Sequence, residues 1–566
     1  MDSETSSSST GEDAMTAVDR VTVELIRSSL YYASEEMGIA LRNSSYSPNI
    51  KERMDHSATI FDSDGRLLAQ AEHIPVHLGS LPWGLKNIIE YCQKEGLSLE
   101  EGSMIVANNP YIAGTHLNDL TVVRPIYYRG ELVAFAANKA HHADVGGSVP
   151  GSISIDARTI FEEGFIMNPV QLMRRNEFLK ETVSLFASNS RSPVERTGDL
   201  KAQVAANITG ERRVLQLIER YGLENFLSAA EESFNYTERI MRSRVSTMMN
   251  EGTFRAKDYV EDPNGKDITL RVKLTVLNNR IHVDYTGTDR QVPFAINAVF
   301  GVTLSGVHFV VRTLIGDDVP MNEGAFRVVD VYSPEGTVLY ASFPYPVAGG
   351  NLETSQRNAD LLYLAFSQSL PERVPAASGG SMNNVMIGGM HEGKSWAFYE
   401  TIGVGLGGRH GMDGLDGIQA NMTNTMNTPI EEIERSIPIL IRRYGFRQNS
   451  CGAGRFRGGS GLIRAYEMLA ESTTFTVLAE RGKHEPPGLL GGSGGAKTKV
   501  VLYRNQQGKH RKKGLPIKHT AILEKGDIVE MQTAGGGGYG NPKNRDPRRV
   551  SDDLENGIIT KPYARS

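Results

Sequence analysis

Two short clusters of histidine and carboxylate residues are the part of this sequence best suited to chemistry. The first is Gly114–Asp119 (GTHLND), and the second is Lys139–Gly147 (KAHHADVGG). Imidazole nitrogens and carboxylate oxygens are ligands for divalent metals such as zinc, iron and manganese. The spacing His-x-x-Asp is common and means little alone, and a histidine doublet could equally belong to a solvated loop. The pairing of two such clusters is what favours a metal site.

The segment between the clusters has the pattern of a β-hairpin. Residues 121–128 and 131–138 are both β-rich runs, and Arg129-Gly130 lies between them as a tight turn. The hairpin therefore predicts two antiparallel strands whose far ends carry the two clusters.

The register of this hairpin predicts which residues meet. If the turn is two residues long, the numbers of facing residues sum to about 259. Asp119 then faces Ala140, and Asn118 faces His141. His116, Asp119 and His141 should lie within side-chain reach of one another at one end of the ladder.

Length and composition bound the fold and the partners. A chain of 566 residues exceeds the usual size of one core, so several domains or subdomains are expected. Hydrophobic residues make up 39% and charged residues 22%, which is typical of an ordinary soluble protein. The net charge is −5 and we expect no basic stripe, so nucleic acid is not an expected partner.

The sequence carries no pattern that indicates export or a membrane. No apolar run approaches the roughly 18 residues that span a bilayer. Residues 1–14 are rich in serine, threonine and acidic residues, which predicts a disordered tail rather than a signal peptide. Cys92 and Cys451 lie far apart and lack the spacing of a thiolate metal site. We therefore expect a cytoplasmic protein.

Glycine is abundant, with 59 residues, and 19 of them lie in four clusters, at 403–408, 452–461, 488–495 and 535–540. Such clusters permit positive φ and close backbone approach. None of the clusters has the strand, GxxxxGK[ST] and helix order of a phosphate-binding loop. We expect tight turns in a β-rich core, with phosphate binding as the weaker alternative.

Hydrophobic periodicity predicts an α+β fold with mixed helices and largely antiparallel sheets in several subdomains. Residues 18–42 should form an amphipathic helix in which Val21, Leu25, Leu30 and Met37 recur near helical spacing. From about 385 to 535, short strands should alternate with glycine-rich turns. The other predicted elements are hairpins at 58–71 and 268–285 (turned at Asn278-Asn279) and helices at 81–95, 199–249 (with breaks at Gly210 and Gly222), 297–314 and 360–370.

Seven ordered motifs resemble the hydantoinase B family. This family comprises the B subunits of ATP-dependent hydantoinases, N-methylhydantoinase and caprolactamase, the C-terminal half of 5-oxoprolinase, and the alpha subunit of acetone carboxylase. The motifs are Lys51–Ser57 (KERMDHS), His73–Gly79 (HIPVHLG), Asn109–Asp119 (NPYIAGTHLND), His141–Gly147 (HHADVGG), Gly349–Arg357 (GGNLETSQR), Gly454–Gly459 (GRFRGG) and Gly535–Pro542 (GGGGYGNP).

The resemblance covers about residues 15–545 and implies an arrangement of regions within them. A metal-site region would span about 50–165, a helical region about 199–249, and a glycine-rich β region about 385–540. Residues 546–566 would form a peripheral tail.

The resemblance also implies one divalent metal ion, zinc in the hydrolases and manganese in acetone carboxylase. His142 and Asp144 would orient the ligands or carry protons, although a solvated loop stays open as an alternative. The implied ligands are Asp55, which the resemblance alone supplies, together with His116, Asp119 and His141.

The function that the resemblance implies is shared between two chains. A larger A-type partner would bind ATP and phosphorylate the substrate, and this chain would deliver metal-activated water to a cyclic amide. The expected assembly is a hetero-oligomer. One alternative is the alpha subunit of a carboxylase that acts on a ketone such as acetone. Another is a non-catalytic scaffold subunit, against which the absence of cysteine ligands argues.

Overall fold

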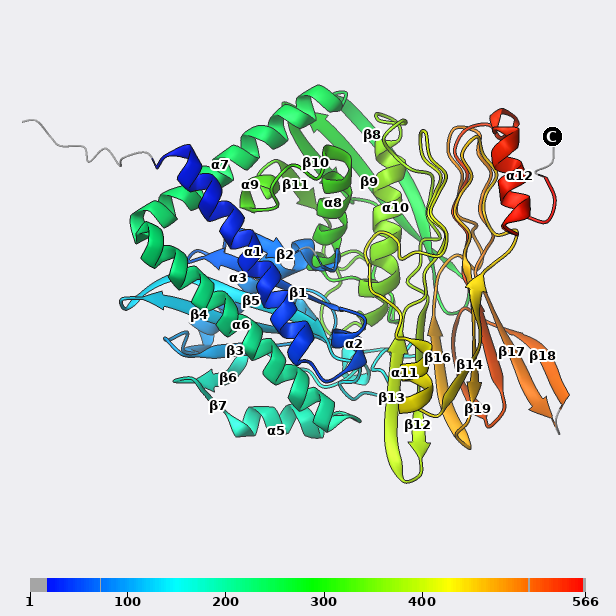
Figure 1. The fold of residues 1–566 in the computed structure, drawn as a ribbon, viewed down its shortest axis with the longest axis horizontal. Helices are drawn as coiled ribbons and strands as arrows, with labels where there is room; N and C mark the ends of the chain where they lie inside the picture. The colour runs from blue at the N-terminus through cyan, green and yellow to red at the C-terminus, as the bar shows by residue number, and fades with distance from the viewer. Residues whose placement is uncertain (1–17, 72, 507–508, 563–566) are drawn as a thin grey trace, which may run out of the picture.

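The computed structural model describes residues 18–71, 73–506 and 509–562. The tail predicted at residues 1–14 lies outside the described residues. Helices and antiparallel sheets are mixed along the chain, which confirms the predicted fold class, and a helix-rich part lies beside a part made largely of strands (Figure 1). Among the named strands of the described residues, only β10 (Arg280–Asp284) and β11 (Val329–Tyr332) pair in parallel.

A seven-stranded sheet positions the two histidine clusters. Its strands lie in the order β2, β1, β5, β4, β3, β6, β7. The start of β1, the start of β4 and the end of β5 lie at the same end of this sheet, because β5 pairs antiparallel with both neighbours. The strands are β1 (His56–Asp62), β2 (Leu67–Ala71), β3 (Met104–Ala107), β4 (Asp119–Tyr128), β5 (Glu131–His141), β6 (Val170–Arg174) and β7 (Glu177–Phe178).

The register of the β4–β5 hairpin differs by one residue from the prediction. Tyr128 faces Glu131 as expected, but a β-bulge near the turn shifts the rest of the ladder. Asp119 therefore faces His141 directly, rather than Ala140. The bulge is not visible in the sequence, and its effect is to bring the two clusters closer together than the regular hairpin would.

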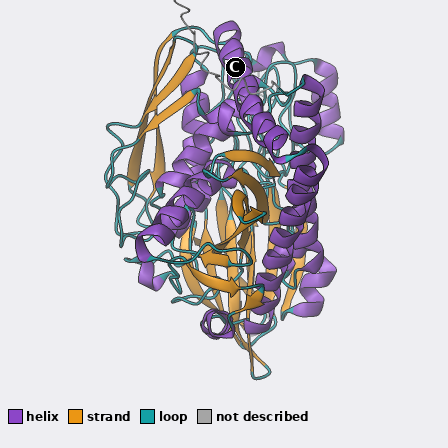
Figure 2. Ribbon diagram, turned by 90° about the vertical axis from the view of Figure 1, so that its left-hand side faces the viewer, coloured by secondary structure: helices purple, strands orange, loops and turns teal. Residues whose placement is uncertain are grey.

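Helices cover both faces of this sheet. α1 (Arg20–Ser44) and α6 (Pro193–Tyr221) pack against one face, and α3 (His77–Glu95) packs against the other. In the view turned by 90° the strands lie between helices (Figure 2). Because both faces are covered, strands such as β1 are buried along their whole length and show no alternation of buried and exposed residues.

Helix α1 is amphipathic in a different way from the prediction. Leu30 and Met37 are buried, but Val21 is 68% exposed and Leu25 is 47% exposed. Gly210, which was predicted to break a helix, lies inside α6, where an added Cβ would come within 2.5 Å of the Met37 sulfur. This glycine therefore lets α6 approach α1 closely, and the helix break occurs only at Gly222.

A second sheet and two buried helices connect the two parts of the molecule. The sheet has the order β11, β10, β9 (Asp267–Leu277), β8 (Gly252–Glu261). α10 (Ser355–Phe366) packs on β8 and β9 and against α8 (Phe300–Ile315). The β9–β10 turn is the predicted one, with φ of 51° at Asn278 and 59° at Asn279. The remaining α-helices are α2 (Pro48–Lys51), α4 (Pro110–Ala113), α5 (Lys180–Ser188), α7 (Leu223–Met248), α9 (Glu323–Phe326), α11 (Ile430–Ser436) and α12 (Pro547–Glu555).

Two further antiparallel sheets form the strand-rich part, as predicted for residues 385–535. One has the order β13, β12, β16, β19, and the other has the order β14, β15, β20, β17, β18. Both contribute to one apolar core, in which Phe475 and Val477 lie with Tyr466 and Met531. The strands are β12 (Asn384–His391), β13 (Lys394–Glu400), β14 (Ile439–Phe446), β15 (Leu462–Met468), β16 (Ser472–Leu478), β17 (Lys499–Gln506), β18 (Lys509–Leu515), β19 (Lys518–Glu524) and β20 (Ile528–Gln532).

The glycine clusters are close-packed segments rather than the tight turns that we predicted. Their backbone N–H groups donate to carbonyls of neighbouring glycine-rich segments: Gly405 donates to Ala534, and Gly536 donates to Gly459. These donors are therefore used within the fold and cannot cradle a phosphate.

Close backbone approach is the reason for glycine at these positions. An added Cβ would lie 1.8 Å from the Leu415 carbonyl oxygen at Gly459, and 1.9 Å from the Leu406 carbonyl oxygen at Gly536. Neither glycine has a positive φ. What each position requires is the absence of a side chain, not a left-handed backbone.

The edge strand β18 carries a local basic stripe, contrary to the prediction of none. The strand carries Lys509, Arg511, Lys512 and Lys513, all exposed, and no aspartate or glutamate. Exposed charges of this kind on an edge strand disfavour pairing with the edge of another sheet.

Candidate metal centre

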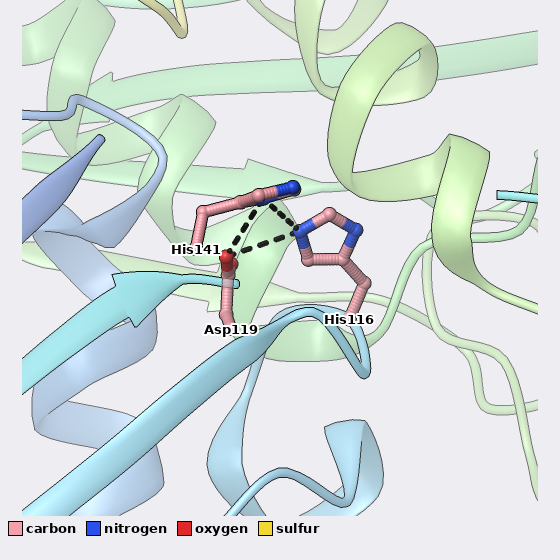
Figure 3. A group of neighbouring side chains, drawn as sticks. All are labelled: His116, Asp119 and His141. Carbon is pink, nitrogen blue, oxygen red and sulfur yellow. Dashed lines mark hydrogen bonds and ion pairs between the residues drawn. The ribbon is translucent and has the colours of Figure 1, made fainter. Parts of the chain in front are cut away.

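Three buried side chains converge at the end of the β4–β5 hairpin. His116 Nε2 lies 3.1 Å from Asp119 Oδ1 and 3.1 Å from His141 Nδ1, and His141 Nδ1 lies 3.2 Å from Asp119 Oδ1 (Figure 3). All three side chains are at most 2% exposed. The structure thus brings together the three residues that the hairpin register predicted to lie within reach.

The triangle of these three atoms fits a bound cation better than hydrogen bonds alone. One carboxylate oxygen can accept a hydrogen bond from each imidazole, but the two N–H groups would then be crowded together with their nitrogens only 3.1 Å apart. Atoms bound to one ion at about 2.0–2.1 Å are separated by roughly this distance. His116, Asp119 and His141 therefore fit a divalent metal.

Protonation states around the triangle also suit metal binding. Burial alone would raise the pKa of the Asp119 carboxyl, but His116, His141 and His77 hold it well below its ordinary value. Burial lowers the pKa of His141 and of His77. An ionised carboxylate among neutral imidazoles is the state in which these groups bind metals.

Backbone turns place His116 in this position. Asn109 caps the short helix α4, accepting the Tyr111 N–H, and the helix ends at Gly114 with φ of 97°. An added Cβ at Gly114 would lie 2.7 Å from the Ser80 carbonyl oxygen. Only glycine therefore fits where the chain turns back along α3 toward His116 and β4.

His77 was not among the predicted site residues, although the structure places it beside Asp119. It opens helix α3, and its Nε2 lies 3.4 Å from Asp119 Oδ2 while its Nδ1 lies 2.9 Å from Ser57 Oγ. His77 thus orients the carboxylate from the side opposite the triangle. Local spacing could not show this contact, because α3 meets β4 only in the folded sheet. The one available signal was its place in the motif His73–Gly79.

Asp55 lies close to the triangle but outside it. Its Oδ2 is 3.9 Å from His141 Nδ1, and its backbone carbonyl accepts the N–H of His141. The three-residue group that offers ligand atoms within 4.8 Å of one another does not include it. Its role as a ligand remains a prediction from the resemblance.

His142 and Asp144 have partners on other elements. His142 Nε2 lies 3.0 Å from Gln203 Oε1 on α6, and burial lowers the pKa of this histidine to about 4. Asp144 forms an ion pair of 2.9 Å with Arg191 and accepts the backbone N–H of Gly151. These contacts anchor the segment that follows His141, and the predicted roles in ligand orientation and proton transfer remain predictions.

A small cavity adjoins the triangle. This metal cavity has a volume of about 20 Å³, room for about one water molecule. Asp55, His77, Asp119 and His141 line one side. Its other walls are Ile74, Val76, Asn351, Leu352, Met382, Tyr399, Thr401, Met422 and Thr423. The ring of Tyr399 also stacks on His141, with centroids 4.7 Å apart.

Comparison with known proteins gives the family. The profile described as hydantoinase B/oxoprolinase matches residues 19–542. The chain belongs to the hydantoinase B/oxoprolinase family. An uncharacterized protein of Methanocaldococcus jannaschii is 47% identical over 96% of this chain and 94% of its own. The caprolactamase subunit beta of Pseudomonas jessenii is 31% identical over 97% of this chain and 96% of its own.

Another relative and two solved structures are also similar over most of this chain. 5-Oxoprolinase 1 of Arabidopsis thaliana is 34% identical over 90% of this chain, which spans only 41% of that protein. The crystal structure of the ATP-dependent caprolactamase from Pseudomonas jessenii matches with a TM-score of 0.88 at 29% identity, over 96% of this chain and 95% of that one. Acetone carboxylase matches with a TM-score of 0.89 at 18% identity, over 96% and 78%, a likeness of fold.

Proposed function

We propose that this chain is the metal-containing B-type subunit of an ATP-dependent hydrolase of cyclic amides. The observation that carries the proposal is the buried triangle of His116, Asp119 and His141 beside a cavity with room for a water molecule. Its similarity to caprolactamase subunit beta supports the reaction class, and the name of that relative implies a second subunit.

The proposed ligands are the three residues of the triangle, with Asp55 as a fourth after a small movement. His77 holds the second oxygen of Asp119, and Asp144 holds the chain after His141 through Arg191. A divalent ion, zinc or manganese, would supply a lowered pKa for a water molecule and polarisation of a carbonyl or phosphoryl oxygen. His77, which also lines the metal cavity, is placed to accept the proton that such water releases.

The A-type partner would supply the step that this site lacks. Phosphorylation of an amide oxygen with ATP makes the ring carbon a better electrophile, and the reaction then needs only a nucleophile and a proton acceptor. The carboxylase alternative uses the same ligands on a ketone, and its support here is a fold match at 18% identity. The chain is 31% identical to a caprolactamase subunit over nearly its full length, so we rank hydrolysis above carboxylation.

Metal analysis tests the site directly. We expect about one divalent ion per chain in protein isolated without chelator, because the described residues contain one convergent ligand set. His116→Ala and His141→Ala should each empty the site. His391→Ala, which removes an exposed imidazole at the tip of the β12–β13 hairpin, should keep the metal. Full metal content in both site variants would refute the ligand assignment.

A substrate panel tests the reaction. The complex with a co-expressed A-type partner should form ADP in the presence of hydantoins, 5-oxoproline or lactams, and should release the ring-opened acid. Ketones should be turned over only with bicarbonate if the carboxylase alternative is correct. Bicarbonate-dependent consumption of a ketone with no activity on any cyclic amide would replace the proposed function with that alternative.

A further inference from the structure

A large cavity lies at the junction of the helical and strand-rich parts. This junction cavity has a volume of about 590 Å³, within the range of about 300–1,000 Å³ typical of small-molecule sites. Phe309 and Leu314 of α8 and Tyr363 of α10 line one wall, and Leu406 and Leu489 of the glycine-rich segments line another. Junctions between parts of a chain are common places for ligands.

Two short segments form the partition between the junction cavity and the metal cavity. Pro75 faces the junction cavity while its neighbours Ile74 and Val76 face the metal cavity. In the second segment Met422 faces the metal cavity, and Thr423 lines both. The segments are joined by a hydrogen bond of 3.3 Å from the Val76 N–H to the Met422 carbonyl. The partition is thus a single layer of chain.

The acidic side chains that line the junction cavity are all paired with arginine. Asp258 lies 3.3 Å from Arg357 Nη1, and Asp360 lies 2.7 Å from Arg481 Nη2. Asp413 receives two hydrogen bonds from Arg545, at 2.7 and 3.0 Å. The acidic groups therefore contribute little net charge to the cavity.

Three cations of the lining are left without a carboxylate. Lys257, Arg373 and Arg409 are exposed side chains of this cavity, and none forms an ion pair within the described part of the chain. Eleven of the 23 uncharged lining residues are proline, alanine, leucine or valine, and Phe309 and Tyr363 add aromatic surface. Apolar walls with a few uncompensated cations fit a small molecule that has an apolar body and an anionic group.

We propose that the junction cavity binds a small anionic molecule, a carboxylate or a phosphate ester, and holds it against the partition next to the metal cavity. Arg373, Arg409 and Lys257 bind the anionic group, and Asn421 and Thr423 meet the uncharged end. The link to catalysis rests on the proposed function, in which the activated substrate is anionic. The binding itself depends only on the charges and the shape of the cavity.

Calorimetric titration of the full, metal-loaded chain tests this site without turnover. The probes are 5-oxoproline, which joins a carboxylate to a cyclic amide, 2-pyrrolidinone, the same ring without the carboxylate, and inorganic phosphate. Among the described residues, Arg373 and Arg409 are the two lining arginines without a carboxylate partner. Replacing both with alanine should weaken binding of the anionic probes at least about tenfold and leave the affinity for 2-pyrrolidinone unchanged. A matched control, Arg435→Ala with Lys525→Ala, removes two exposed cations outside the cavity and should bind as wild type.

Binding of 5-oxoproline alone would identify a carboxylate ligand, and binding of phosphate alone would identify a phosphate ester. The proposed site is refuted if neither anion binds the wild-type chain. It is also refuted if the variant with Arg373→Ala and Arg409→Ala binds both anions as tightly as the wild-type chain does. These outcomes differ from a failure of the proposed function. A complex that is inactive on every cyclic amide, but whose anion binding depends on Arg373 and Arg409, would retain the cavity and lose the hydrolase assignment.

Discussion

Asp119 is the residue at which the chemistry of this site can be separated from its folding. One of its oxygens lies between His116 and His141, and the other lies beside His77. Asp119→Asn keeps the size of the side chain but removes its formal charge. Metal affinity should fall, and turnover by the reconstituted complex should drop at least about tenfold, because the charge of the ligand set tunes the acidity of bound water.

The thermal midpoint separates these effects in the Asp119→Asn variant. It should fall by no more than the loss of bound metal explains, since asparagine keeps the size of the side chain and so the packing of the apolar core around the site. Wild-type and variant chains should therefore melt together once both are stripped of metal. An Asp119→Asn variant that retains its metal and full turnover would show that this carboxylate has only a structural role.

Asp360 is a second residue whose ionisation has a measurable consequence. Burial raises the pKa of its carboxyl from 3.8 to about 7, against the opposing effect of Arg357. Between pH 4 and 7 the folded chain therefore binds more protons here than the unfolded chain, and stability falls as pH rises through this window. The groups that face it are Arg357, Arg481, Asp258, Asn421 and Ser378.

Thermal midpoints at pH 5.5 and 7.5 measure the effect of Asp360. The wild-type midpoint should fall more between these values than that of Asp360→Asn, which cannot ionise. The comparison concerns the change with pH, because the substitution also alters hydrogen bonds to Asn421 and Arg481. Equal changes in the two chains would mean that Asp360 does not titrate in this range.

At the scale of secondary-structure elements, the sequence predicted local features well and long-range contacts poorly. The Arg129-Gly130 and Asn278-Asn279 turns determine their hairpins through neighbouring residues, so both were predictable. The bulge in the β4–β5 ladder has no such signal. The contact of His77 with Asp119 depends on how α3 packs against the sheet, and the junction cavity depends on two parts of the chain far apart in sequence. Spacing along the chain carries neither kind of information.

The glycine-rich segments were expected to form tight turns, whereas the structure shows mainly close approach of one backbone to another. Because these segments are closely packed, a side chain added at one of their glycines should destabilise the fold mainly by steric clash. Gly459→Ala, whose Cβ would lie 1.8 Å from the Leu415 carbonyl oxygen, should destabilise the chain by about 3 kcal/mol or more. Gly445→Ala in β14 is the matched control, since no atom lies within 4 Å of its added Cβ. Denaturant midpoints should separate the two variants, and equal midpoints would contradict close packing as the reason for glycine.

At the scale of the whole molecule, the described residues contain a candidate metal centre and a large cavity, and a segment with the spacing of a phosphate-binding loop does not fold as one. Gly388–Ser395 (GGMHEGKS) has the spacing of such a loop. In the structure it forms the β12–β13 hairpin, with Gly388 paired to Ala397, and it leads into a strand rather than a helix. A helix N-terminus, which that motif needs for phosphate, is therefore missing there. Among the described residues no helix has the length and apolar character needed to cross a membrane.

The proposed function predicts that activity depends on a partner. The purified chain alone should neither hydrolyse ATP nor open a cyclic amide, although it should hold its metal. Co-expression with an A-type chain should yield a hetero-oligomer, with more than one copy of each chain because soluble assemblies are usually symmetric. Mass measurement of the complex and coupled detection of ADP would test both expectations. The Gly388–Ser395 hairpin provides an internal control: Lys394→Ala should leave ATP hydrolysis by the complex unchanged, whereas the lysine of a true phosphate-binding loop would be essential. Robust ATP-dependent ring opening by the isolated chain would contradict the division of labour between two subunits.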